Sequence, residues 1–210
     1  VAVGNYALDA LTSGDNNTAV GHLALSAQTT ASDNTAVGYR SLATNTTGAG
    51  ATAVGRDSLY SNTTGTFNTA VGKYALWANT TGNSNTAVGY DALAANTTAA
   101  DNTAVGRNTL LANTTGANNV AIGRDALLAN TTAAGNTSVG MESMKSNTTG
   151  TLNVALGFQA MELNTTGSRN IAIGHEAYAN SDTENDNIAI GEDAMTSNTA
   201  GGTKNIAIGN

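Results

Sequence analysis

Asn119-Val120-Ala121-Ile122-Gly123 decides the fold, because the whole chain is built from copies of this stretch. It appears first in full as Asn17-Thr18-Ala19-Val20-Gly21 and last as Asn205-Ile206-Ala207-Ile208-Gly209. The glycines that close each copy lie at positions 4, 21, 38, 55, 72, 89, 106, 123, 140, 157, 174, 191 and 209, so every step is 17 residues except the last, which is 18. A period this regular predicts a solenoid in which each repeat contacts mainly its two neighbours.

The composition suits an elongated repeat protein better than a globular one. Aromatic residues make up only 4% of the chain, and proline and cysteine are absent, so strands can stack without interruption and no disulfide joins them. The net charge of −7 argues against a nucleic-acid partner. No apolar run approaches the roughly 20 residues of a membrane span. We expect residues 1–210 to form a single solenoid domain of about twelve coils, a segment of a longer fibrous protein.

The opening pentad of each repeat alternates in the manner of a β-strand. The column that contains Ile122 is always aliphatic, and the column that contains Ala121 is always small. We therefore predict that the aliphatic column faces the inside of the coil and that the small column forms a smooth outer face for close packing. The candidates for an oligomer interface are then Ala19, Ala36, Ala53, Ala70, Ala87, Ala104, Ala121, Ser138, Ala155, Ala172 and Ala189.

The second half of each repeat, residues 126–132 in this copy, predicts a second short strand followed by a turn. Its inward candidates form a leucine column: Leu8, Leu25, Leu42, Leu59, Leu76, Leu93, Leu110, Leu127, Met144, Met161, Tyr178 and Met195. Eight Asn-Thr-Thr sequences follow, at Asn45, Asn62, Asn79, Asn96, Asn113, Asn130, Asn147 and Asn164. Glycosylation at every coil would crowd neighbours about 4.8 Å apart, so these asparagines predict a ladder of amides bonded from coil to coil.

The copies Asn170-Ile171-Ala172-Ile173-Gly174 and Asn187-Ile188-Ala189-Ile190-Gly191 resemble the head repeats of trimeric autotransporter adhesins, the YadA-like family. The longer unit, from Asn-Thr-Ala-Val-Gly through Asn-Thr-Thr-Gly, is similar to repeats of phage tail fibres and tail-fibre-like bacterial surface proteins. The resemblance covers essentially the whole chain and implies an all-β, left-handed parallel β-roll, three copies of which pack into a homotrimeric fibre. It also implies an extracellular place, on an outer-membrane-anchored adhesin or a virion tail fibre. The 17-residue repeat is longer than the adhesin unit.

Other folds and activities fit the sequence less well. Val37-Gly38-Tyr39-Arg40-Ser41-Leu42 resembles one hexapeptide of the left-handed β-helix of sugar acyltransferases, but that fold needs about three hexads per coil. Asp125 with Glu142, and Glu176 with Asp193, are acidic pairs one coil apart that a polysaccharide-degrading enzyme could use. His22 and His175 lie nine coils apart, and we expect no catalytic, metal or cofactor site. The acidic stretch 182–186 offers oxygen ligands for calcium, although a solvated turn is the simpler interpretation. Stacked threonines such as Thr131 and Thr132 leave an ice-binding solenoid open.

Recognition along such a chain must reside where the repeats differ, and the aromatic residues gather in one stretch. Tyr60 and Trp77 share a column on adjacent coils, and aromatic faces on a surface often stack on sugars or proteins. We therefore predict a non-enzymatic, adhesive segment that contacts a host surface protein or glycan. The candidate contacts are Tyr60, Phe67, Tyr74, Trp77, Tyr90, Arg56 and Lys73.

Overall fold

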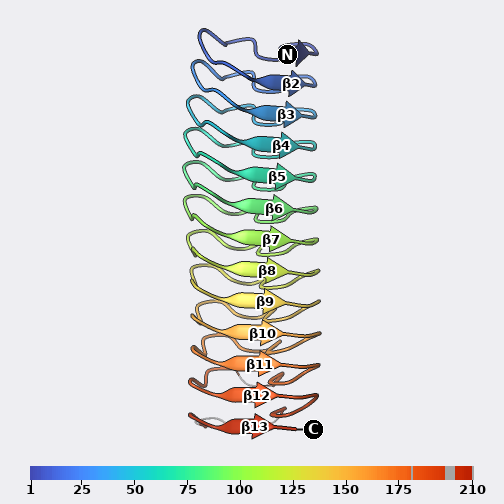
Figure 1. Cartoon of the computed structure of the whole chain (residues 1–210), viewed down its shortest axis with the longest axis vertical. Helices are drawn as coiled ribbons and strands as arrows, with labels where there is room; N and C mark the ends of the chain where they lie inside the picture. The colour runs from blue at the N-terminus through green and yellow to red at the C-terminus, as the bar shows by residue number, and fades with distance from the viewer. Residues whose placement is uncertain (181, 197–201, 210) are drawn as a thin grey trace. The chain divides into compact units, whose positions relative to one another are not determined.

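The computed structural model describes residues 1–180, 182–196 and 202–209, and the chain divides into two compact units, residues 1–102 and 103–210. Each unit is a stack of 17-residue coils with one short strand per coil, so the predicted parallel β-solenoid is confirmed (Figure 1). The described residues contain no helix. The predicted handedness and trimeric packing remain expectations.

The strands lie in sequence order within each unit, and each one pairs in parallel with the next. Residues one repeat apart are partners, as for Ala36 and Ala53. The N-terminal unit contains β1 (Ala2–Val3), β2 (Thr18–Val20), β3 (Thr35–Val37), β4 (Thr52–Val54), β5 (Thr69–Val71) and β6 (Thr86–Val88). The C-terminal unit contains β7 (Thr103–Val105), β8 (Val120–Ile122), β9 (Thr137–Val139), β10 (Val154–Leu156), β11 (Ile171–Ile173), β12 (Ile188–Ile190) and β13 (Ile206–Ile208).

The prediction of a second strand in each repeat was wrong, because that half of the coil consists of turns. Leu127 has a φ of 50° and Asp125 a φ of 59°, both in the left-handed region that a strand excludes. Bonds between coils nevertheless continue through these turns: the amide of Leu127 donates to the carbonyl of Ser143 over 3.1 Å. The backbone is thus bonded to neighbouring coils well beyond the three-residue strands.

The predicted direction of the strand faces was also wrong. Ala121 is fully buried inside its coil, whereas Ile122 is 40% exposed. The leucine column already fills the interior, so the strand side chain that faces it must be small. All eleven predicted interface residues are fully buried within the chain, including Ser138, whose hydroxyl donates to the carbonyl of Ser143. Their side chains therefore cannot form an oligomer interface, and the aliphatic column lies on the outside.

Leucine and asparagine side chains fill the coils, as the sequence predicted. The leucine column is fully buried from Leu25 to Tyr178. Side-chain amides of the Asn-Thr-Thr asparagines donate to the corresponding asparagine of the coil before, as in Asn79 to Asn62 at 2.9 Å, which confirms the predicted ladder. At its N-terminal end Asn45 donates to Gln28 instead. A second ladder runs through the asparagines that precede each strand. There the backbone N–H of Asn136 donates to the side-chain Oδ1 of Asn119, one coil before, at 3.0 Å. These buried amides are not accessible for glycosylation.

The glycine that closes each strand cannot be replaced without strain, because it has a positive φ and because the next coil lies too close for a side chain. Gly123 has a φ of 129°, and a Cβ there would collide with the carbonyl oxygen of Gly140 in the next coil. Such close backbone contact leaves no space for a side chain. The glycine column therefore sets the tight spacing of the coils at the start of each turn.

Candidate functional site

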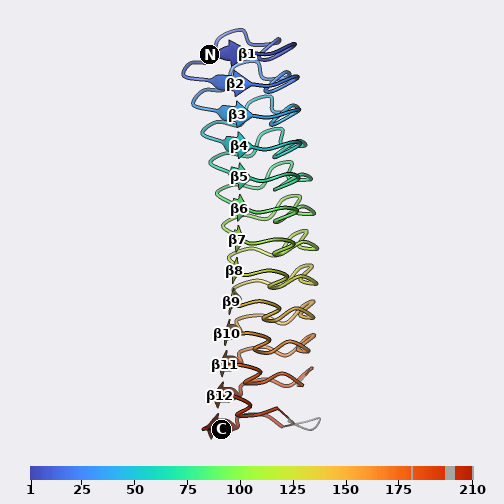
Figure 2. The same cartoon turned by 90° about the vertical axis from the view of Figure 1, so that its right-hand side faces the viewer.

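The residues that differ between coils lie on the segments that follow each strand. Within each unit these connecting segments extend away from the side occupied by the strands (Figure 2). The repeats differ at the two residues after the glycine, the one after the leucine and the turn pair before the next asparagine. They place side chains of successive coils side by side, so a cluster here combines residues 17 positions apart.

The predicted aromatic strip forms in the N-terminal unit, though not with all of its predicted members. The rings of Tyr60 and Trp77 are stacked, with centroids 6.5 Å apart and planes inclined by 11°. Tyr74 and Tyr90 meet edge to face at 6.4 Å. Lys73 Nζ lies 4.7 Å from the centre of the Tyr74 ring and 5.6 Å from that of Tyr90, within the range of cation–π attraction.

Phe67 lies apart from this strip. It occupies the turn before Asn68, and its ring lies against Gly50 of the preceding coil. A Cβ added to Gly50 would be only 2.7 Å from Phe67 Cδ1. Phe67 is 68% exposed, so it is an isolated surface ring against the preceding coil and does not belong to the aromatic cluster.

A buried carboxylate organises the cations next to the strip. Asp57 is fully buried, and it accepts from Arg40 Nε at 2.7 Å and from Arg56 Nε at 3.1 Å. The guanidinium of Arg40 also lies over two rings, 4.7 Å from the centre of Tyr60 and 5.1 Å from that of Tyr39. The hydrogen bond to Asp57 raises the pKa of the Arg40 guanidinium. Two arginines share one carboxylate, so this group carries a net positive charge.

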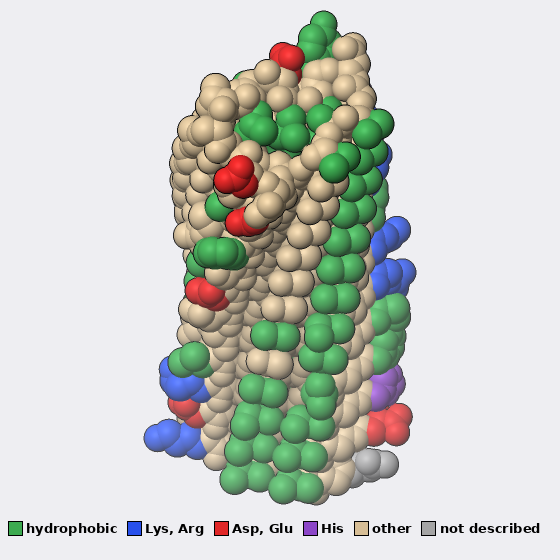
Figure 3. Space-filling model, turned by 45° about the horizontal axis from the view of Figure 1, so that its top comes forward, with side chains coloured by type: hydrophobic (Ala, Val, Ile, Leu, Met, Phe, Trp, Pro, Cys, Tyr) green, Lys and Arg blue, Asp and Glu red, His purple; other side chains and the backbone are tan. Residues whose placement is uncertain are grey.

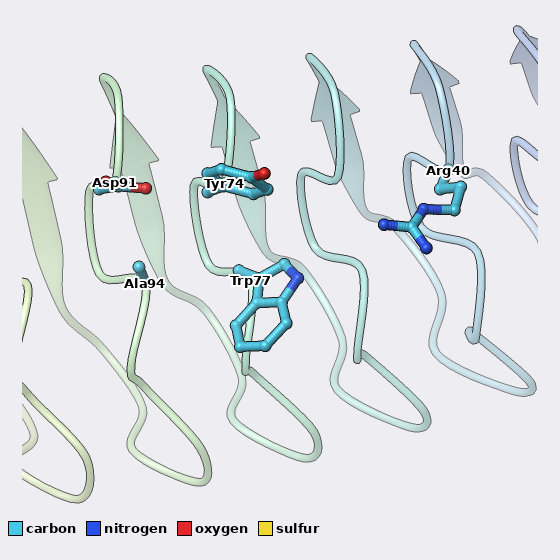
Figure 4. A pocket seen from close by; sticks show the side chains of 5 residues that line it. All are labelled: Arg40, Tyr74, Trp77, Asp91 and Ala94. Carbon is cyan, nitrogen blue, oxygen red and sulfur yellow. The ribbon is translucent and has the colours of Figure 1, made fainter.

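A groove of about 320 Å³ opens beside these residues, lined by Arg40, Tyr74, Trp77, Asp91 and Ala94 (Figure 4). Sequence reasoning named Tyr74 and Trp77 but missed Arg40, Asp91 and Ala94. The 17-residue spacing contained the signal, because Arg40, Tyr74 and Asp91 share one column. Trp77 and Ala94 share another. The five residues that line the groove thus come from only two columns of the repeat.

Three of the four carboxylates considered for catalysis lie beside basic or imidazole side chains. Arg124 lies 3.5 Å from Asp125 and 3.3 Å from Glu142, and Lys145 also lies 3.6 Å from Glu142. In the other pair, Glu176 lies 3.3 Å from His175, whose ring stacks on Phe158. Asp125, Glu142 and Glu176 thus each have a basic or imidazole side chain beside them.

The acidic stretch 182–186 is likewise bound by its neighbours. Asp186 accepts from Arg169 at 2.6 Å, and this hydrogen bond lowers the pKa of the Asp186 carboxyl. Glu184 is buried, and its Oε2 accepts from the Thr183 amide. Among the described residues, no group of three histidine, aspartate or glutamate side chains is arranged to hold a metal ion.

The outer face of the strands is the second candidate surface. Its exposed aliphatic side chains include Val20, Val88, Ile122, Val154, Leu156 and Ile173. In the C-terminal unit the outward residue at the start of the strand is also aliphatic in β8, β10, β11, β12 and β13, whereas β2 to β7 begin with threonine. Figure 3 shows apolar side chains gathered in adjacent rows over these strands. This face is an uncovered apolar surface of the single chain.

No model of a known protein family matches the sequence, and no curated protein or solved structure is significantly similar to it. The part of the chain that the structure describes contains no helix with the length and apolarity needed to cross a membrane.

Proposed function

We propose that this chain is a structural and adhesive segment of a homotrimeric attachment fibre, located outside the cell on a bacterial surface or a virion tail. The observation that carries the proposal is the apolar outer face of the strands, especially β8 and β10–β12. Its aliphatic side chains are 36–44% exposed at Ile122, Val154, Leu156 and Ile173. Sheets made only of parallel strands are normally covered on both faces. Here the leucine column covers one face and leaves the other to a partner.

A second and third copy of this chain are the partners that fit best. Each copy presents aliphatic rows at the same spacing, about 4.8 Å from coil to coil. Rows from different copies can therefore pack in register within each unit. The number three and the left-handed roll rest on the resemblance to adhesin heads and tail fibres. The variable residues lie on the connecting segments, so they remain accessible when the strand faces meet.

In this proposal the chain has two roles, and neither is catalytic. The repeated interior provides a stiff segment, and the variable surface provides recognition of a host surface protein or glycan. The aromatic strip in the N-terminal unit is the candidate contact.

Sedimentation of the 210-residue chain tests the assembly. We expect a species of about 63 kDa, three chains of 20.9 kDa each, at micromolar concentration. Leu156→Asp should yield the monomer, because it places a carboxylate on the exposed apolar face, while circular dichroism should remain that of the β-solenoid. Thr132→Asp, an exposed change away from the strands, should leave the trimer intact. A wild-type monomer at these concentrations would contradict the proposal.

Adhesion needs a separate measurement. Fluorescently labelled trimer should bind cultured host cells, and an excess of unlabelled trimer should displace it. A trimer that binds no surface, across bacterial and animal cells, would limit the chain to a spacer.

Ice binding is a second candidate, and one observation favours it. The strands β2 to β6 all read Thr-Ala-Val, and their buried alanines place the threonine and valine on the outer face in five successive coils. A flat, regular array of this kind can match an ice lattice. The change to valine and isoleucine at the first position in the C-terminal unit interrupts the hydroxyl row and favours protein contact instead. Thermal hysteresis of the purified chain would support ice binding, and its absence would exclude it.

A further inference from the structure

The groove in the N-terminal unit combines groups from three different coils. Arg40 follows β3, Tyr74 and Trp77 follow β5, and Asp91 and Ala94 follow β6. Figure 4 shows the Arg40 guanidinium pointing along the stack toward Tyr74 and Trp77, with Asp91 at the other end. The groove therefore has an aromatic middle, a cation at one end and a carboxylate at the other.

The indole of Trp77 provides a flat apolar wall that is open to a ligand. Trp77 is 43% exposed and stacks on Tyr60 of the preceding coil. In the following coil the equivalent position is Ala94. Its small methyl group leaves room beside Trp77 where a larger side chain would stand. A ligand with a flat apolar face can occupy this room and stack on the indole.

Arg40 is held in place by protein contacts that leave part of its guanidinium unused. Its Nε is bonded to Asp57, and its guanidinium lies over the rings of Tyr39 and Tyr60. Among the described residues, no hydrogen bond is made by its two terminal nitrogens. A positioned planar guanidinium with two free nitrogens binds a carboxylate in a bidentate manner.

Asp91 sets the chemistry of the opposite end. Its backbone amide donates to the carbonyl of Lys73 at 3.1 Å. Its carboxylate makes no hydrogen bond or ion pair with any described residue. An ionised carboxylate is an acceptor with two oxygens, so it suits neighbouring hydroxyl groups and repels a second acidic group.

We propose that this groove binds a glycan that contains one carboxylate sugar attached to neutral sugars. The apolar face of a pyranose ring stacks on Trp77, the carboxylate binds the terminal nitrogens of Arg40, and hydroxyls of the neutral part donate to Asp91. The volume of about 320 Å³ lies at the small end of ligand pockets, roughly 300–1,000 Å³, and accommodates one or two sugar rings. The proposal rests on the proposed adhesive function and specifies its ligand.

A polyanionic chain fits the groove less well. Asp91 faces any second acidic group, and the whole chain carries a net charge of −7. Binding should therefore depend on one acidic group near Arg40 and should not increase with the number of acidic groups.

The other coils supply matched variants for the test. Ala43 occupies the position of Trp77, Gln159 that of Arg40, and Asn108 that of Asp91. Trp77→Ala, Arg40→Gln and Asp91→Asn therefore introduce residues that the same fold already holds. Phe67→Leu is the control, because it removes an exposed ring outside the groove and Leu152 occupies the same position five repeats later.

Isothermal titration of the 210-residue chain with 3′-sialyllactose, lactose and a heparin tetrasaccharide measures the preference. We expect sialyllactose to bind at least tenfold more tightly than the other two. Trp77→Ala and Arg40→Gln should each weaken binding by tenfold or more, Asp91→Asn should weaken it several-fold, and Phe67→Leu should not change it. Circular dichroism melting confirms that each variant is folded.

The proposal would be overturned by equal binding of lactose and sialyllactose, by tighter binding of heparin, or by sialyllactose binding that Trp77→Ala leaves unchanged. A trimer that binds cells but not sialyllactose would also overturn this ligand class while leaving the attachment function in place. If the chain is monomeric and still binds sialyllactose with the expected variant pattern, the ligand assignment holds and the fibre proposal fails.

Discussion

Asn62 Nδ2 donates to Asn45 Oδ1 over 2.8 Å, from one coil to the coil before it, with both side chains fully buried. The same amide also donates to the carbonyl of Gly65, and its own oxygen accepts from Asn79. One side chain thus connects three coils and closes its own turn. Buried amides of this kind stabilise only when every donor and acceptor is satisfied.

Asn62→Ala should therefore destabilise the chain strongly. It leaves Asn45 Oδ1, the Gly65 carbonyl and an Asn79 N–H without their partner, and each such buried group costs about 1–3 kcal/mol. We expect a loss of about 3 kcal/mol or more in the free energy of unfolding, measured by urea denaturation. Thr64→Ala, an exposed change in the same turn, should have almost no effect. Equal effects would show that the amide ladder contributes little.

The two kinds of glycine should respond differently to substitution. Gly123→Val forces a β-branched residue to a φ of 129° and directs its Cβ at the backbone of Gly140. Gly135→Ala meets only the flexible end of Leu152, with 2.8 Å to Cδ2. Its column already holds other residues at positive φ, such as Asn118 at 59°. We expect about 1–2 kcal/mol for Gly135→Ala and several times more for Gly123→Val. Similar melting temperatures for the two variants would contradict this.

The repeat period, the leucine column and the asparagine ladder could all be predicted, because each is a residue type repeated in one register. The facing of the strand could not, because both faces of Val120-Ala121-Ile122 are apolar and alternation alone does not say which points inward. The decision depends on volume: a coil already filled by Leu127 has room for Ala121 and not for Ile122. The second strand was predicted wrongly because leucine rarely adopts positive φ, yet Leu127 does so here with its coil-to-coil bond retained.

The part of the candidate site whose residues share a column of the repeat could be predicted from the sequence, and the rest could not. Tyr60 and Trp77 stack because they share a column, and this follows from the sequence alone. Arg40 reaches its rings through a long side chain that crosses to the next coil, where Asp57 fixes it. The direction of such a side chain depends on its partners and not on its column. Phe67 was included because it is close in sequence, but its column lies elsewhere on the coil.

The ion pair between Arg169 and Asp186 predicts a local pH dependence. The hydrogen bond from Arg169 lowers the pKa of Asp186 in the folded chain below its ordinary value. The stabilisation from this pair is therefore present above the ordinary carboxyl pKa and is lost as the pH falls through the lowered folded value. Arg169→Gln should raise the midpoint of the Asp186 titration, followed by carbon-detected NMR. A midpoint that does not move would show that Arg169 is not its partner in solution.

The facing of the strand gives the sharpest test of the whole structure, because two neighbouring substitutions should fail in different ways. Ala121 points into the coil and has no exposed surface, so Ala121→Arg must bury a charge among side chains or force the coil open. An unpaired buried charge is among the costliest changes a fold can receive, and the variant should lose its β-sheet circular dichroism or melt far earlier. Ile122→Arg points outward, where Ile122 is 40% exposed. It should keep the spectrum of the β-solenoid and lose association in sedimentation, because the charge would lie within the proposed contact between copies. Arg124→Ala, on the connecting segment, should change neither property. If Ala121→Arg instead gave a folded monomer and Ile122→Arg an unfolded chain, the strand would face the opposite way and the outer apolar face would not exist.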